Sequence, residues 1–285
     1  LSADAKVPMV MMLHGTSGSG DKFYGISGWV EKADQEHFIA VFPSALALCI
    51  FSDENRDGLV QPGELEVTTK WADGHIGTTL RLCTDAELAR APSAVQAQVE
   101  SRTVPDDLAF LRAAVARLEA ELPVDPARVT VSGFSNGAQM SARLAVEASD
   151  LFGAVGVAGG SLEVSGPIPR KLPVIVSLGS LDESALNKTP GVTEFPLDQG
   201  ALAIPQVAAV LDAFVQAMGL GGVSPTWALD RIDGVDVGHF RWHRDGTPDL
   251  EFLVIKGATH QYPNGTNHPV VMTGVLWPTF AAARR

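Results

Sequence analysis

The fold is decided by the stretch Arg128-Val129-Thr130-Val131-Ser132-Gly133-Phe134-Ser135-Asn136-Gly137-Ala138-Gln139-Met140. A β-branched run ends at Gly133 and a helical pattern begins at about Asn136, so Ser135 lies in a turn between a strand and a helix. Within Gly-x-Ser-x-Gly, this context predicts a nucleophile elbow. Such a turn strains the serine backbone and exposes its hydroxyl at the carboxyl edge of a sheet, opposite the dipole of the following helix. We interpret Ser135 as a nucleophile, and a purely structural turn is the alternative.

Length and composition place the stretch in a single large domain. The chain has 285 residues, of which 46% are hydrophobic, and its even apolar patterning predicts one domain over residues 1–285. No run of 18 apolar residues occurs, so we expect no membrane span. The net charge of −12 argues against nucleic acid and anionic membranes as partners. These features predict a protein, which we expect to be monomeric, acting on neutral substrates.

Cys49 and Cys83 are the only cysteines in the chain. They could form one disulfide, or they could be two buried thiols in a cytosolic protein. The sequence opens at Leu1, without Met and without a signal-like segment. We interpret it as a processed or truncated product, which favours a secreted, extracellular protein.

The first strand leads into a loop with a specific use. Residues 8–13 are all apolar, which is typical of a strand buried on both faces, and the glycine-rich segment 14–20 follows. The backbone N–H of Thr16 in this loop could pair with that of Asn136 to hold an oxyanion. A phosphate-binding loop is the rival interpretation, but the lysine and spacing of a P-loop are missing.

Strands and helices alternate along most of the chain. Apolar runs at 38–43, 128–133, 154–159 and 172–178, and the pair at 238–243 and 250–256, predict further strands. Helical patterns occupy 29–37, 106–122, 136–145 and 205–218. This order predicts an α/β fold with a mostly parallel, doubly wound sheet and helices on both faces.

A serine nucleophile needs a base within hydrogen-bond reach and an acid that orients the base. In hydrolases with this elbow, the chain order is serine, acid, histidine, with acid and base on loops at the carboxyl edge. Asp182 directly follows an apolar strand and is the preferred acid, with Asp198 in reserve. His260, in a glycine-rich turn after the last strand, is the preferred base among the seven histidines.

Residues 44–102 interrupt the alternation and predict an irregular insert. Within it, residues 53–64 match a twelve-position calcium loop, with oxygen ligands at Asp53, Asn55 and Asp57, the carbonyl of Leu59, and a closing bidentate Glu64. Gly58 occupies the sharp turn of that loop. We expect an isolated structural calcium site, and an acidic solvated loop is the alternative. Cys49 and Cys83 bracket this insert, so a disulfide could fasten its base to the domain.

Several motifs resemble a known family. They are the segments 14–15, 106–111, 123–129, 133–137 and 257–263, the last of which reads Gly257-Ala258-Thr259-His260-Gln261-Tyr262-Pro263. Together they are similar to the secreted α/β-hydrolases that include polyhydroxybutyrate depolymerases and feruloyl esterases. The resemblance covers most of the chain outside the insert. Two departures are the segment Leu178-Gly179-Ser180-Leu181-Asp182, where the family has His-Gly-Thr-x-Asp, and the absence of the family's first two strands.

The resemblance implies an extracellular serine carboxylic ester hydrolase of the polyester or oligoester type, with no organic cofactor. Feruloyl or acetylxylan-type esterases and aromatic polyester hydrolases are alternatives, as are an acyltransferase and a non-catalytic calcium-binding module. The aromatic side chains of Phe134, Trp71 and Tyr262 are candidates to line the substrate cleft, and ordinary core packing is the alternative for them. The acid and alcohol halves of the ester are left open by the sequence.

The calcium loop yields a stability prediction. Three negative charges at Asp53, Asp57 and Glu64 repel one another until a cation closes the loop. Calcium at about a hundred times its dissociation constant should therefore stabilise the fold by roughly 2.7 kcal/mol. Scanning fluorimetry of wild type and Glu64→Gln, each with EGTA and then with calcium, measures this effect. An identical melting temperature in all four samples would mean that the loop is only an acidic turn.

Overall fold

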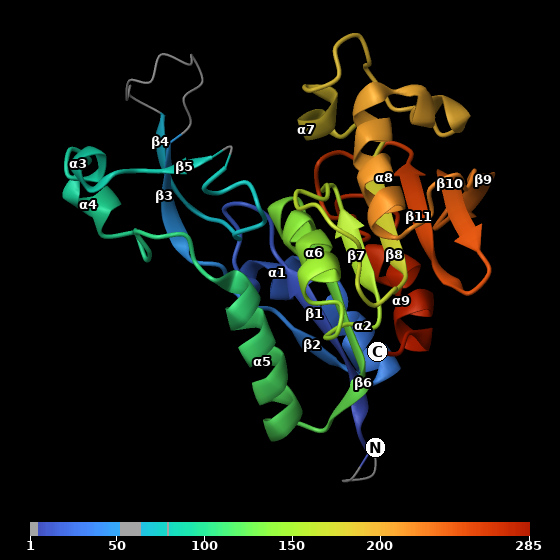
Figure 1. Ribbon diagram of the computed structural model, residues 1–285, viewed down its shortest axis with the longest axis horizontal. Helices are drawn as coiled ribbons and strands as arrows, with labels where there is room; N and C mark the ends of the chain where they lie inside the picture. Colours follow the sequence, from blue (N-terminus) through green and yellow to red (C-terminus); the bar gives the residue numbers. More distant parts are fainter. Residues whose placement is uncertain (1–4, 52–63, 79) are drawn as a thin grey trace.

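An eight-stranded sheet forms the centre of the computed structural model, which describes residues 5–51, 64–78 and 80–285 (Figure 1). Its strand order is β2-β1-β6-β7-β8-β11-β10-β9. Neighbours from β2 to β11 pair in parallel, whereas β11, β10 and β9 pair antiparallel. The strands are β1 Val7–Leu13, β2 Ile39–Val41, β6 Val124–Phe134, β7 Val155–Ala158, β8 Val174–Gly179, β9 Thr226–Ile232, β10 Val235–Arg244 and β11 Thr247–Ile255.

Strand β1 shows why the sheet is covered on both faces. Its successive side chains point to opposite faces, so Met9 and Met11 enter one apolar cluster while Val10 and Met12 enter another. The first cluster is covered by α5 (Asp107–Glu121), α6 (Asn136–Glu147) and α8 (Pro205–Ala217). The second is covered by α1 (Gly20–Ile26), α2 (Trp29–Glu36) and α9 (Met272–Ala282). The predicted α/β fold with a mostly parallel sheet is therefore confirmed.

The antiparallel edge of the sheet contains a strand that we did not predict from the sequence. Strand β9 pairs with β10 through the turn at Asp233 and Gly234, both of which have positive φ, 49° and 79°. Asp-Gly between two extended runs is a strong hairpin signal, since that turn type needs positive φ at both positions. Within the described residues, no helix is both long enough and apolar enough to cross a bilayer.

The insert at 44–102 is more regular than we predicted. It contains a three-stranded antiparallel sheet of order β4-β3-β5, together with the short helices α3 (Asp85–Leu88) and α4 (Ser93–Gln96), and lies beside the main body in Figure 1. The strands are β3 Ala47–Phe51, β4 Leu65–Thr69 and β5 Arg81–Leu82. Leu48, Ile50 and Ile76 form a small core of their own, which explains why these segments are ordered. A short apolar run can fold as a strand without any wider alternation around it.

Two sets of bonds hold this insert. A disulfide joins Cys49 in β3 to Cys83 just after β5, with the Cα atoms 5.4 Å apart, so of the two states that the sequence allowed the structure has the disulfide. At the end of β4, the Thr69 carbonyl accepts from the Ser17 N–H at 3.0 Å, and the Thr69 hydroxyl donates to the Gly18 carbonyl at 2.6 Å. The insert therefore contacts the loop that follows β1.

Reduction of the disulfide should loosen the insert. The bridge closes a sequence separation of 34 residues, and a loop of that size is worth about 2 to 4 kcal/mol through restriction of the unfolded chain. The double variant Cys49→Ser with Cys83→Ser should melt at a lower temperature than wild type, and reductant should lower only the melting temperature of wild type. Equal melting temperatures in all samples would contradict the prediction.

Candidate active site

Ser135 lies at the tip of a strained turn between β6 and α6. Its backbone has φ 52° and ψ −119°, outside the regions that L residues ordinarily adopt. A β-carbon at Gly133 would lie 2.1 Å from the Gly137 carbonyl oxygen, and one at Gly137 would lie 2.3 Å from the Leu13 carbonyl oxygen. Only glycine fits at either position, because the Gly137 oxygen is fixed in helix α6 and the Leu13 oxygen is fixed in strand β1. The expected elbow is present.

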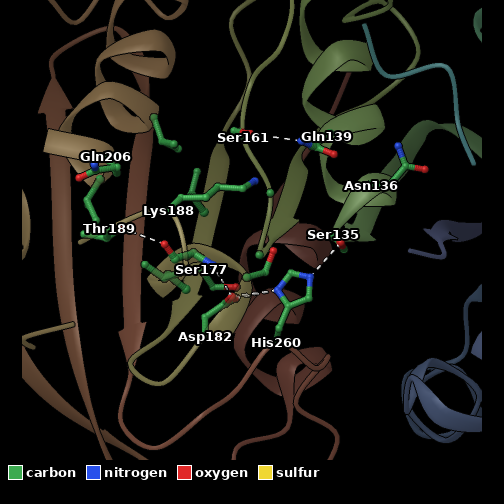
Figure 2. A pocket seen from close by; sticks show the side chains of 18 of the residues that line it. Ser135, Asn136, Gln139, Ser161, Ser177, Asp182, Lys188, Thr189, Gln206 and His260 are labelled. Atoms are coloured by element: carbon green, nitrogen blue, oxygen red, sulfur yellow. Dashed lines mark hydrogen bonds and ion pairs between the residues drawn. The ribbon is translucent and has the colours of Figure 1, made fainter. Parts of the chain in front are cut away.

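Three expected side chains meet at this turn (Figure 2). His260 Nε2 lies 2.9 Å from Ser135 Oγ, and His260 Nδ1 lies 2.9 Å from Asp182 Oδ2 and 3.0 Å from Oδ1. Because Asp182 faces Nδ1, the proton of a neutral His260 is held on that nitrogen. Nε2 is then free to accept the Ser135 proton.

The acid position is fixed by its own surroundings. Asp182 follows β8, is buried, and caps the short helix α7 (Glu183–Leu186) by accepting from the Ala185 N–H at 3.0 Å. The Glu183 carboxylate accepts from the His260 N–H at 2.9 Å, which ties the histidine loop to the same helix. Asp198, the reserve acid, instead caps the 3-10 helix η1 (Gln199–Ala203) at Gly200. The structure brings Asp182, and not Asp198, to His260.

Thr16 and Asn136 line the same cavity as Ser135. Asn136 is the first residue of α6, so its N–H has no intrahelical partner. The loop carrying Thr16 is held by buried His14, whose Nε2 accepts from the Ala45 N–H at 3.0 Å and whose Nδ1 donates to the Gly15 carbonyl at 2.7 Å. Burial lowers the pKa of His14, in keeping with this neutral tautomer.

The Asn136 side chain connects the elbow to the insert. Its Oδ1 accepts from the Trp71 N–H at 2.7 Å, and its Nδ2 donates to the Trp71 carbonyl at 3.1 Å and to Asp73 Oδ2 at 2.7 Å. All these groups are buried. Since a buried polar group that loses its partner costs about 1 to 3 kcal/mol, the segment at 71–73 is fixed by the residue next to Ser135.

His75 continues this network and faces the cavity. It lies between two carboxylates, with Nδ1 3.2 Å from Asp73 Oδ2 and Nε2 2.9 Å from Glu163 Oε2. Hydrogen bonds to Asp73 and Glu163 raise the pKa of His75 to about 9, and the same contacts lower the pKa of both carboxyls. At neutral pH this is a cation held between two anions.

The cavity has a volume of about 530 Å³ and an apolar wall on the side away from the elbow. That wall consists of side chains from β8, α8, β11 and the loop before η1, namely Val176, Leu178, Phe195, Val207, Val210, Leu211 and Phe252. A pocket of this size with an apolar wall suits a small aliphatic or aryl group. Ser135 and His260 lie at its edge, in contact with the same space.

The aromatic residues expected to line the cleft lie elsewhere. Trp71 is fully buried and donates from Nε1 to the His14 carbonyl at 2.9 Å, while buried Tyr262 accepts from Trp29 Nε1 at 3.1 Å. Phe134 is half-buried and packs on the His260 ring, with centroids 4.9 Å apart, but it does not line the 530 Å³ cavity. Large aromatic surfaces are stabilised by burial, which placed Trp71 and Tyr262 in the core. The predicted substrate contacts are therefore wrong for Trp71 and Tyr262, and the one for Phe134 stays a prediction.

Phe195 and Phe252 supply the aromatic lining instead. Phe252 belongs to a strand that we did predict from the sequence. Because side chains alternate between the two faces of a sheet, the strand pattern could have shown that Phe252 lies on the face with the cavity. Phe195 lies in a loop with no periodic pattern, and His75 lies in the insert. Neither carried a sequence signal that pointed to the cavity.

The calcium positions Asp53, Asn55, Asp57 and Leu59 lie outside the described residues. Glu64, the closing position, is described and buried just before β4. In the part of the chain that the structure describes, no group of three or more His, Cys, Asp or Glu side chains is arranged to hold a metal ion.

Comparison with known proteins places this geometry among esterase-like folds. No model of a known protein family matches the chain. A curated protein named "Putative esterase NocK", from Nocardia uniformis subsp. tsuyamanensis, is 30% identical over 199 residues, 63% of this chain. This chain spans only about half of that relative, 55% of its length.

Two solved structures superpose over nearly the whole chain. An acetyl xylan esterase from Aspergillus awamori has a TM-score of 0.56 at 13% identity, covering 98% of this chain and 91% of its own. Arabidopsis thaliana SOBER1 F65L has a TM-score of 0.52 at 15% identity, covering 91% and 94%. The chain has an α/β-hydrolase fold. Its Ser135 elbow, Asp182 after β8 and His260 after β11 follow the order usual for that fold.

The raised pKa of His75 predicts a pH-dependent stability. A folded pKa of about 9 exceeds the ordinary value of 6.5, so its stabilisation is fully present below pH 6.5 and is lost as the pH rises towards 9. The difference in melting temperature between wild type and His75→Gln should therefore be largest near pH 6 and should shrink towards pH 9. Groups that do not contact His75 act equally on both proteins. A difference that stays constant or widens with pH would contradict the assignment.

Proposed function

We propose that the chain is a serine carboxylic ester hydrolase that acts through an acyl-enzyme. The observation that carries the proposal is the hydrogen-bonded line from Ser135 Oγ through His260 to Asp182, at a strained elbow beside an apolar cavity. The curated relative and the Aspergillus protein are both named as esterases, which supports the same reaction class.

The geometry suits the following sequence of proton transfers. Ser135 Oγ attacks the ester carbonyl carbon while His260 Nε2 takes its proton, and Asp182 stabilises the imidazolium that forms. The N–H groups of Thr16 and Asn136 hold the negative oxygen of the tetrahedral intermediate. His260 then gives the proton to the leaving alcohol as its bond to the acyl carbon breaks. Water, deprotonated by the same nitrogen, attacks the acyl carbon, and the bond to Ser135 Oγ breaks as His260 returns the proton to Oγ, which releases the acid.

For the substrate, we propose a polyester- or oligoester-type ester whose apolar part enters the cavity between β8, α8 and β11. The apolar wall, with Phe195 and Phe252, supports short hydroxyalkanoyl units and also fits feruloyl or other aryl groups. Feruloyl and acetylxylan esters and aromatic polyesters are the alternatives. The motifs shared with polyhydroxybutyrate depolymerases favour the first choice.

We also propose that the protein is extracellular and binds one structural calcium ion at residues 53–64. The Cys49–Cys83 disulfide supports an oxidising compartment, since such bonds persist mainly outside the cytosol. The calcium proposal rests on the twelve-position pattern of the sequence. In this proposal the ion closes the insert and takes no part in the chemistry at Ser135.

The assigned triad predicts a ranking of variants. Ser135→Ala should lower turnover of 4-nitrophenyl butyrate by about 10⁴-fold or more, since members of a triad act as a unit. Asp182→Asn should lower it by roughly 10³- to 10⁴-fold, because His260 loses the partner that fixes its tautomer. Asp198→Asn is the matched control and should retain turnover near the wild-type rate. Residual activity above a tenth in Ser135→Ala, or the reverse ranking of the two aspartates, would refute the assignment.

A further inference from the structure

The lining of the cavity is not apolar throughout. Besides the apolar wall it includes two lysines, Lys70 and Lys188, together with the polar side chains of Thr16 and Gln139, and we call this part of the lining the mouth. Lys70 comes from the insert directly after β4, and Lys188 from the segment after α7. Two ammonium groups from distant parts of the chain thus face one space. The neutral substrates expected from the net charge give no reason for this arrangement.

Neither lysine forms an ion pair with any residue that the structure describes. The lysines that form ion pairs in the described part of the chain are Lys32, with Glu36, and Lys256, with Glu194, and neither of them lines the cavity. Lys70 Nζ has one weak contact, 3.4 Å from Thr16 Oγ1. Figure 2 shows the Lys188 side chain extending into the pocket above His260. Lys70 is half-buried and Lys188 is exposed, and both line the same cavity.

Carboxylates near the two lysines offset part of their charge, but no ion pair joins them to either lysine among the described residues. His75 is a third cation at the mouth, but Asp73 and Glu163 already bind both of its nitrogens. Asp182 is engaged with His260. Burial is the main cause that lowers the pKa of Lys70; Lys188 adds to this effect, while Asp73, Glu66 and Glu163 oppose it. An anion placed between the two ammonium groups would relieve their mutual repulsion and replace the water that Lys70 has lost.

We infer that Lys70 and Lys188 form a binding subsite for an anionic group, a carboxylate or phosphate, carried by the ester that Ser135 cleaves. The inference rests on the proposed esterase function and narrows its substrate class to esters with a negative charge a few atoms from the scissile carbonyl. A linear oligoester with a free acid end carries such a carboxylate, whereas the interior of a polyester chain does not. The subsite thus selects the soluble, acid-terminated substrate.

The two lysines lie close to the groups that would carry out the reaction. Lys70 contacts Thr16, whose N–H is assigned to the oxyanion, and Lys188 reaches in from the side of the Asp182 loop. The anion would therefore lie across the mouth from the apolar wall. One substrate end would pack on Phe195 and Phe252 while the other meets the two ammonium groups, which orients the ester relative to Ser135.

The test compares matched charged and neutral esters. For the acyl side, the pair is mono-4-nitrophenyl glutarate and 4-nitrophenyl pentanoate; for the alcohol side, it is the 3-hydroxybutyrate dimer and the carboxamide of that dimer. For each pair, the ratio of kcat/KM, charged over neutral, is measured in wild type, Lys70→Gln, Lys188→Gln and Lys188→Arg. Lys32→Gln is the control, since Lys32 lies on α2 away from the cavity. Melting temperatures verify that each variant is folded.

We expect the ratio for at least one pair to fall about tenfold in Lys70→Gln and in Lys188→Gln, to stay near wild type in Lys32→Gln, and to recover in Lys188→Arg. Raising the salt concentration should reduce the wild-type ratio, because Lys188 is exposed to solvent. Inhibition of pentanoate hydrolysis by inorganic phosphate or by glutarate identifies which anion is preferred. Ratios for both pairs that are equal in all five proteins would overturn the inference, whereas wild type inactive on every ester would instead refute the proposed function.

Discussion

Close contact between the backbone segments that meet at the Ser135 turn is the constraint on which the rest of the structure depends. Gly133 and Gly137 let β6, the start of α6 and the end of β1 approach to distances that no β-carbon would allow. The chain can then turn within one residue, at the cost of positive φ at Ser135. Such strain persists only where the surroundings over-determine it, and here a buried parallel sheet and a packed helix do so.

The other parts of the site are attached to this turn in a definite order. Asp182 and His260 come from the ends of β8 and β11, which are adjacent parallel strands, so both loops emerge at the same edge of the sheet. The insert is attached through Asn136, which binds both backbone groups of Trp71 and the carboxylate of Asp73. The Arg143 guanidinium on α6 also donates to the Ala72 carbonyl. Helix α6 therefore positions both the nucleophile and the insert segment that lines the cavity.

Sequence reasoning succeeded where chemistry imposes a local pattern and failed where burial decides. Glycines around Ser135, an aspartate directly after an apolar strand and a histidine in a glycine-rich turn are local signals, and the structure brings these three residues into hydrogen-bond contact. The aromatic residues were misplaced because Trp71 and Tyr262 are close to the site in sequence but are drawn into the core. Lys188 and Phe195 could not be anticipated, since only the folded loops between β8 and α8 bring them to the cavity.

The division of the cavity between two segments has a consequence for how proteins of this kind diversify. The reacting groups and the apolar wall belong to the main body of the fold, whereas three other residues of the cavity lining, Lys70, His75 and Leu80, belong to the insert. Replacement or drift of the insert can thus change which molecules are admitted without altering bond cleavage, provided that the Asn136 contacts survive. The insert thus adds to a selection of substrates that the apolar wall begins, while bond cleavage stays with the sheet and its helices.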